Sequence, residues 1–241
     1  KVYKLREHVE RIFASAALLK IYPQITPDEL CKLIEELVKK LDSDEQWVYF
    51  QFSRGTDYRN HAFPESATPN LWIMLKPAKI KDTYRPLRVI TREDTRALHC
   101  NIKSLNLLPS VMATQACVDA GVDECILHRD GIVTECAHSN VSILKNGTLF
   151  THPANEFILA GTGRAHLMSA CHHFEIPVVE RPYTLDDLKD ADEVILTSAS
   201  ALCMRIVEVD GVYVGKKAPH TLKTLQDYLL NDFLTGTTPN T

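Results

Sequence analysis

Lys103 is the residue whose type and setting first suggest chemistry. It lies in the polar segment Asn101-Ile102-Lys103-Ser104-Leu105-Asn106, between a stretch with strand character and one with helical character. A loop in that place can present a side chain to a cleft. A neutral lysine amine can form a Schiff base with a carbonyl compound, which makes covalent catalysis the relevant chemistry. Taken alone the pattern is weak, because most lysines are solvated surface residues.

Arg59 and His61 form a second candidate site, in the polar loop 54–70. In extended backbone, residues two apart project to the same side. A guanidinium and an imidazole placed this way can bind one anion together, and a carboxylate is the ligand that fits both. The alternative interpretation is an exposed polar loop without a ligand.

The elements around Arg59 and His61 predict a small α+β domain over residues 1–78. Apolar residues recur at helical spacing from Leu5 to about Ile21. A second helix begins with a capping box, in which Thr26 caps the helix and Glu29 completes the box. Strands are expected at Trp47–Ser53 and Leu71–Leu75, and the aperiodic stretch Lys76–Pro86 is the expected linker.

Residues 79–241 predict a larger domain that carries Lys103. Asp130-Gly131 and Asn146-Gly147 are two-residue hairpin signals between strand-like runs. The remaining expected elements are strands at Leu87–Ile90, Glu124–His128, Ile132–Cys136, Val141–Leu144, Thr148–Thr151, Pro177–Glu180 and Glu193–Thr197, helices at Leu107–Ala120, Arg164–Phe174 and Leu222–Phe233, and a hairpin around Asp210-Gly211.

Composition excludes several classes of function. A net charge of −4 with scattered Lys and Arg gives no basic stripe for nucleic acid. No apolar run is long enough for a membrane span and no signal-peptide pattern begins the chain, so we expect a cytoplasmic protein. The 7 cysteines lack a C-x-x-C pair and are expected to be reduced. No metal site is expected, because the adjacent His172 and His173 cannot share one helical face.

Several spaced segments together resemble the class IV aminotransferases, a family of pyridoxal-phosphate enzymes that includes D-amino-acid aminotransferases, branched-chain aminotransferases and aminodeoxychorismate lyases. The resemblance covers nearly the whole chain and implies the two-domain fold type IV, of α+β or mixed α/β class, with a small N-terminal α+β domain and a larger mixed-sheet domain. The segments are Glu7-His8-Val9-Glu10-Arg11, Arg54-Gly55-Thr56, Ile102-Lys103-Ser104-Leu105-Asn106, Val133-Thr134-Glu135, Ser139-Asn140-Val141 and Leu159-Ala160-Gly161-Thr162-Gly163-Arg164.

The resemblance also implies roles for individual residues. Lys103 is expected to form the internal aldimine with pyridoxal 5'-phosphate and to move the substrate Cα proton. Glu135 is expected to pair with the pyridine nitrogen and keep it protonated. The other expected cofactor contacts are Arg11, Thr162, Gly163, Ser198 and Ala199 around the phosphate and Leu159 against the ring. Two departures weaken this phosphate site: Gly161-Thr162-Gly163-Arg164 replaces the common Gly-Ile-Thr-Arg, and an alanine occupies a hydroxyl position near Ser198.

The R-x-H pair at Arg59 and His61 resembles the D-amino-acid aminotransferases, where it holds the substrate α-carboxylate. The family then implies transamination between a D-amino acid such as D-alanine and a 2-oxo acid such as 2-oxoglutarate, in a homodimer. A tyrosine that completes the family's carboxylate site would lie upstream of Lys1. The runner-up activity is that of a 4-amino-4-deoxychorismate lyase, which eliminates pyruvate with the same lysine and cofactor. A third possibility is a cofactor-binding or interaction protein that has lost catalysis.

Overall fold

The computed structural model describes residues 1–238. The described chain divides into two compact units. The first unit is Lys1–Ile80 together with the end of the described chain from Gly236 onward, and the second is Lys81–Thr235. Among the described residues, no helix combines the length and apolar character that crossing a membrane requires.

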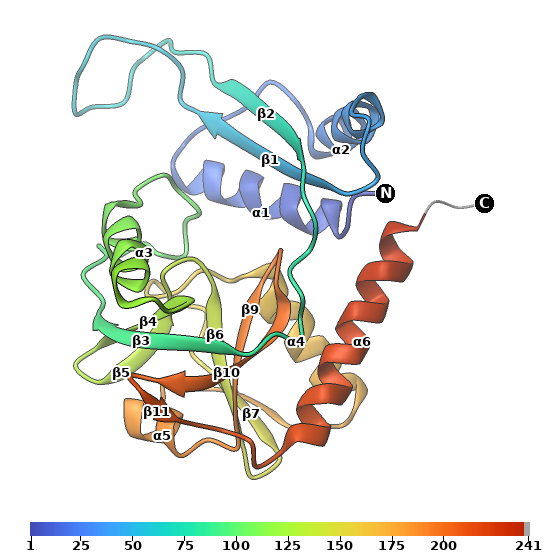
Figure 1. Cartoon of the computed structure of the whole chain (residues 1–241). Helices are drawn as coiled ribbons and strands as arrows, with labels where there is room; N and C mark the ends of the chain where they lie inside the picture. The colour runs from blue at the N-terminus through green and yellow to red at the C-terminus, as the bar shows by residue number, and fades with distance from the viewer. Residues whose placement is uncertain (239–241) are drawn as a thin grey trace. The chain divides into compact units, whose positions relative to one another are not determined.

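The smaller unit packs two helices on a β-hairpin (Figure 1). Phe50 and Ile73 lie opposite each other in the antiparallel hairpin and pack with the buried helix residues Val9, Leu30 and Ile34. Its elements are α1 (Leu5–Leu18), α2 (Pro27–Leu37), the short 3-10 helix η1 (Val38–Lys40), β1 (Gln46–Ser53) and β2 (Asn70–Pro77).

The predicted capping box of α2 is confirmed. The Thr26 hydroxyl accepts the Glu29 N–H at 3.3 Å, and the Glu29 carboxylate accepts the Thr26 N–H at 2.8 Å. These bonds satisfy two N–H groups that have no partner inside the helix. A local sequence motif therefore sets the start of α2.

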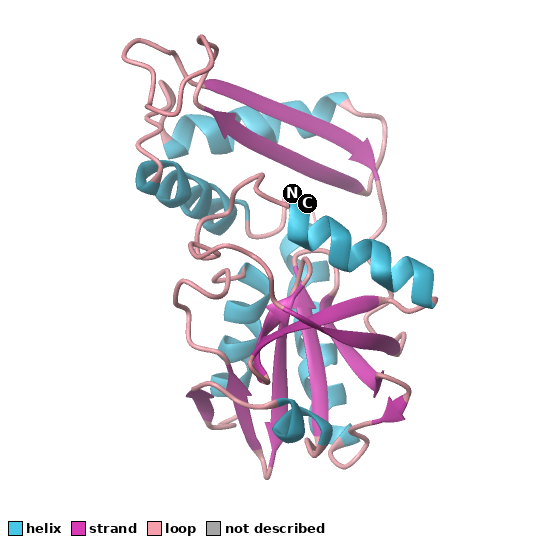
Figure 2. Cartoon of the chain, turned by 90° about the vertical axis from the view of Figure 1, so that its left-hand side faces the viewer, coloured by secondary structure: helices cyan, strands magenta, loops and turns pink. Residues whose placement is uncertain are grey.

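The larger unit is built on a nine-stranded mixed sheet, seen in Figure 2 as a twisted group of strands. The strand order is β5-β4-β3-β10-β9-β6-β7-β8, with β11 paired to β10. Parallel pairing joins β3 to β4, β3 to β10 and β7 to β8, and the other pairs are antiparallel. The elements are β3 (Leu87–Glu93), α3 (Leu108–Ala120), β4 (Glu124–Arg129), β5 (Ile132–Cys136), β6 (Asn140–Lys145), β7 (Thr148–Thr151), α4 (Thr162–His173), β8 (Val178–Glu180), α5 (Leu185–Lys189), β9 (Glu193–Ser198), β10 (Leu202–Val209), β11 (Val212–Tyr213) and α6 (Pro219–Thr237).

Both faces of the central strands are covered. In β9, Val194 and Leu196 join one buried cluster, whereas Ile195 between them joins a second cluster made with α4 and α6. This explains why β9 reads as a continuous apolar run. The predicted turns at Asp130-Gly131 and Asn146-Gly147 are confirmed, with positive φ at both central residues of each.

Candidate active site

Lys103 is exposed on the loop between β3 and α3. The segment leading to it is held in place by backbone hydrogen bonds. The Cys100 N–H donates to the carbonyl of Glu156 at 2.9 Å, and the Ile102 N–H donates to the carbonyl of His99 at 3.0 Å. The start of the Lys103 loop is therefore tied to Glu156, three residues before Leu159.

Glu135 lies near the end of β5 and is only 6% exposed. Its Oε2 accepts the Asn140 side-chain amide at 2.8 Å and the Leu159 N–H at 3.1 Å, while Arg96 donates to its Oε1. Burial raises the pKa of Glu135 to about 7, although the charge and hydrogen bond of Arg96 act in the opposite direction. Near neutral pH, a carboxyl with this pKa is partly protonated, so a cation that binds beside it shifts it to the ionised form.

Arg96 connects Glu135 to a second buried carboxylate. Its guanidinium binds Asp94 through Nε at 2.9 Å and Nη2 at 2.8 Å, and Nη2 also donates to the carbonyl of Phe157 at 3.0 Å. Burial favours a higher pKa for Asp94, but the hydrogen bonds and charge of Arg96 outweigh it and lower that pKa. Asp94 thus neutralises much of the charge of Arg96 and limits how strongly Arg96 stabilises the Glu135 anion.

The sequence predicted no role for Asp94, Arg96 or Asn140. The signal for the first two was a pair of opposite charges shortly before Lys103. An exposed loop shows the same pattern, so only burial reveals the network. Asn140 was part of a family segment, but its hydrogen-bond partners are 5 and 19 residues away in the chain.

The helix α4 begins at Thr162, two residues before the predicted start at Arg164. The extended Gly161 is its N-cap residue, with no side-chain cap and no acidic residue in the first turn. Thr162 and Gly163 therefore lie inside the first turn, where N–H groups have no partner within the helix. Such a helix end, without a carboxylate of its own, suits an anionic ligand.

Gly163 brings the first turn of α4 against the end of β9. A Cβ added at Gly163 would lie 3.0 Å from both the N and the O of Ser198, closer than nearly all real contacts. The Ser198 Oγ accepts the Ala201 N–H at 3.2 Å, and Ala199 is exposed in the turn between them. The glycine at position 163, which departs from the common family segment, thus allows the first turn of α4 to approach the backbone of Ser198 closely. This contact brings Thr162 and Gly163 next to the turn that contains Ser198 and Ala199.

Arg164 follows in the same turn but its charge is used internally. It is buried, and its guanidinium bonds Glu180 at 2.6 Å, the carbonyl of His152 at 2.9 Å and the hydroxyl of Thr151 at 3.0 Å. The positive charge that would oppose the helix dipole is therefore neutralised by Glu180. The first-turn backbone is therefore the candidate anion-binding element of α4.

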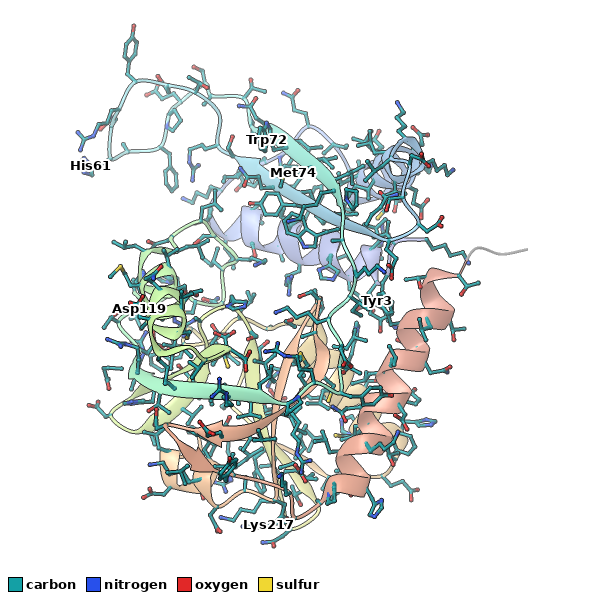
Figure 3. The ribbon with its side chains drawn as sticks, in the orientation of Figure 1. Tyr3, His61, Trp72, Met74, Asp119 and Lys217 are labelled. Carbon is teal, nitrogen blue, oxygen red and sulfur yellow. The ribbon has the colours of Figure 1, made fainter. Side chains whose placement is uncertain are left out.

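The other predicted site residues belong to the smaller unit. Arg11 is half-buried on α1, burial lowers its pKa, and its Nη2 lies 3.4 Å from Nδ1 of His8. Arg59 and His61 are exposed on the loop between β1 and β2, which Figure 3 shows with His61 labelled. Bends occur at both residues, so the same-side argument from extended backbone does not apply and their pairing remains a prediction.

The base of this loop is fixed at Arg54 and Gly55. The Arg54 guanidinium donates to the carbonyl of Leu19 at 2.6 Å and lies 3.7 Å from the Phe63 ring centroid. Gly55 has a φ of +109°, and a Cβ there would lie 2.3 Å from the Thr68 carbonyl oxygen. The loop that carries Arg59 and His61 therefore starts from a defined position.

The larger unit thus brings together Glu135, Leu159, Thr162, Gly163 and the turn at Ser198, and its Lys103 loop is tied to the same region. Among residues 1–238, no group of three or more His, Cys, Asp or Glu side chains is placed to hold a metal ion. The candidate site therefore offers the amine of Lys103, the buried carboxyl of Glu135 with a pKa near 7, and the N-terminus of α4 as a candidate site for an anion.

The chain is similar in sequence to one family of known proteins. The family model described as amino-transferase class IV matches residues 1–209. A D-alanine aminotransferase of Listeria monocytogenes is 36% identical over 236 residues, which cover 95% of this chain and 82% of that protein. A D-alanine aminotransferase of Staphylococcus epidermidis is 39% identical over 215 residues, covering 88% and 76%.

A solved structure shares the fold. The branched-chain amino acid aminotransferase from Thermobaculum terrenum, described as in PLP form, matches with a TM-score of 0.83 at 23% identity, covering 97% of this chain and 79% of that one. Together with the family match over residues 1–209, this confirms the predicted fold class and the resemblance. The chain belongs to the class IV aminotransferases.

Proposed function

We propose that this aminotransferase transfers an amino group between a D-amino acid such as D-alanine and a 2-oxo acid such as 2-oxoglutarate, with pyridoxal 5'-phosphate as cofactor. The observation that carries the proposal is the identity of 36% over 236 residues to a D-alanine aminotransferase, a match that includes the whole Lys103, Glu135 and α4 region. The buried, hydrogen-bonded carboxyl of Glu135 fits a basic ring nitrogen, and the N-terminus of α4, where Gly161 provides no side-chain cap, fits a phosphate. When bound, this cofactor supplies an electron-accepting ring.

The residues of the larger unit divide the work of holding that cofactor. Glu135, with a pKa of about 7 when nothing is bound, is stabilised as an anion by a protonated ring nitrogen and in turn keeps that nitrogen protonated. First-turn N–H groups of Thr162 and Gly163, and the Ser198–Ala199 turn, hold the phosphate. Leu159 packs against the ring, and Lys103 supplies the amine that attaches the cofactor and moves the proton at the substrate Cα.

Residues of the smaller unit supply the cationic contacts in this proposal. Arg11 binds the cofactor phosphate with a permanently charged guanidinium. Arg59 and His61 hold the substrate α-carboxylate. A fixed carboxylate decides which face of Cα meets the lysine, and hence selects D-substrates over L-substrates.

An absorbance titration tests the proposal directly. Full-length protein is mixed with pyridoxal phosphate, and D-alanine or L-alanine is then added. We expect a visible band of lysine-bound cofactor that D-alanine removes and L-alanine does not. Without an acceptor, D-alanine should release one pyruvate per active site, and continued pyruvate formation should require 2-oxoglutarate. Lys103→Ala should abolish the band, whereas Lys39→Ala, which changes another exposed lysine, should leave it intact. A band insensitive to both alanines would refute the substrate assignment, and absence of a band would refute the cofactor assignment.

Self-association belongs to the same proposal, as a homodimer. What supports it is the apolar outer side of α3, directly after the Lys103 loop. Leu108 is 72% exposed, Met112 62% and Val118 66%, and apolar helix faces of this kind usually pack against another surface. Sedimentation equilibrium should give about twice the chain mass, and Met112→Glu should shift it toward the monomer. The cytoplasmic location stays a prediction from the sequence.

A further inference from the structure

Asn140, at the start of β6, is 5% exposed and uses its side-chain amide in two directions. Its Nδ2 donates to Oε2 of Glu135 at 2.8 Å and to the carbonyl of Leu159 at 2.9 Å. The Leu159 N–H donates to the same Glu135 oxygen at 3.1 Å. Two donors that are distant in sequence, from Asn140 and Leu159, therefore meet at one carboxylate oxygen of Glu135.

The carbonyl end of the Asn140 amide has a fixed neighbour as well. A Cβ added at Gly161 would lie 2.0 Å from Oδ1 of Asn140. Gly161 is the N-cap residue of α4, directly before Thr162. The Asn140 side chain thus occupies the space that the missing side chain of Gly161 leaves open.

These contacts link the two ends of the candidate site. Glu135 lies at one end and the first turn of α4 at the other, and the segment 159–161 joins them. Only an amide of this size satisfies both sides: aspartate would bring a second carboxylate to Oε2 of Glu135, and leucine would leave Glu135 and the Leu159 carbonyl without that donor.

We propose that Asn140 is a positioning residue for the aminotransferase reaction, which fixes the carboxylate of Glu135 relative to the N-terminus of α4. It contacts neither substrate nor cofactor in this role and acts through Glu135 and Gly161. The inference rests on the proposed function. It predicts that loss of Asn140 weakens cofactor binding and lowers kcat while leaving the KM for the amino acid nearly unchanged, since the proposed carboxylate contacts, Arg59 and His61, lie in the smaller unit.

A double-mutant cycle in the protein without cofactor tests the contact itself. Gly161→Ala should lower the urea midpoint of the wild-type protein, because its new Cβ meets Asn140. In an Asn140→Ala background the same Gly161→Ala change should be nearly neutral. Equal effects of Gly161→Ala in both backgrounds would overturn the proposal. If Asn140→Ala fails to fold, Asn140→Ser is used in the cycle, and it removes the same amide.

Pyridoxal phosphate titration then tests the role in function. We expect Asn140→Ala to raise the Kd by about tenfold, the effect of losing one hydrogen bond to a charged group, and to change the visible absorbance band. The matched control Asn231→Ala, at an exposed position on α6, should change neither. Unchanged Kd, absorbance and kcat in Asn140→Ala would overturn the proposal. Failure of the wild-type protein to bind pyridoxal phosphate is a separate result, which would overturn the proposed function and with it the role of Asn140.

Discussion

Replacing Arg96 by methionine tests whether the buried charge network holds the candidate site together. Arg96 is 11% exposed at its side chain, Asp94 0% and Glu135 7%, so the substitution leaves two buried carboxylates without their shared cation. Removing one partner of a buried ion pair costs about 3–5 kcal/mol. We expect the low end, about 3 kcal/mol, because Asp94 keeps Arg129 Nε at 3.3 Å and the Thr134 hydroxyl at 3.0 Å.

The pH dependence of the loss follows from the same network. Arg96 lowers the pKa of Asp94 in the folded protein, so the stability from Asp94 is present above its ordinary pKa of 3.8 and is lost as the pH falls through the lowered value. The difference between wild type and Arg96→Met should therefore shrink at strongly acid pH. Glu135 loses a cation in the variant, which raises its pKa further and favours its neutral form at pH 7.

Urea denaturation of the full chain at pH 7 measures the loss, and Arg92→Met is the matched control. Arg92 is an exposed arginine on β3, so its removal should change the free energy of unfolding by less than about 0.5 kcal/mol. A loss below about 1 kcal/mol for Arg96→Met, or equal losses for the two variants, would refute the reasoning.

Three further substitutions test separate parts of the structure. Because the pKa of Glu135 is raised to about 7, its contribution to stability is complete below about pH 4.5 and is lost as the pH rises through about 7. Between pH 4.5 and 8, the free energy of unfolding of the wild type without cofactor should therefore fall by about 3 kcal/mol relative to that of Glu135→Gln. A difference that does not change with pH would contradict this. Gly55→Ala should cost about 2 kcal/mol in urea denaturation, since it combines positive φ with a Cβ against the Thr68 carbonyl, and a neutral effect would show that the loop base can move. Thr26→Ala should cost about 1 kcal/mol through the α2 cap, and the same loss in a Glu29→Ala background would show that the capping box is not cooperative.

Local signals account for the elements that the sequence predicted well. The Thr26 capping box and the Asn146-Gly147 turn specify backbone geometry within a few residues, so reading them needs no knowledge of the fold. The short helix α5 was missed although Thr184 and Asp187 form a capping box there, because five residues carry too little periodicity to be recognised. The start of α4 was misplaced because close packing of Gly163 against Ser198, a tertiary contact, permits glycine inside the first turn.

The residues of the candidate site show the same difference between local signals and tertiary contacts. Lys103 and Glu135 received roles from family segments rather than from their own surroundings, because a glutamate at the end of a strand looks the same whether it is buried or exposed. The parallel pairing of β3 with β4 and β10 was likewise not predicted. Asp94 and Arg96 directly follow β3, so this pairing places them near Glu135 on β5, the strand next to β4. Contacts between residues far apart in the chain leave no trace in local spacing.

The consequence for function lies in the balance of charges around Glu135. Burial raises its pKa to about 7 although the positive charge of Arg96 acts against this rise. Asp94 binds the same guanidinium and so limits how far Arg96 lowers the pKa of Glu135. In the proposed function, a carboxyl with this pKa would be partly protonated in the empty protein and would become ionised when the cationic ring nitrogen binds, so it would not remain a buried, incompletely compensated anion. The neighbours of Glu135 therefore set this property, and a sequence motif that names only the glutamate omits the residues that make it useful.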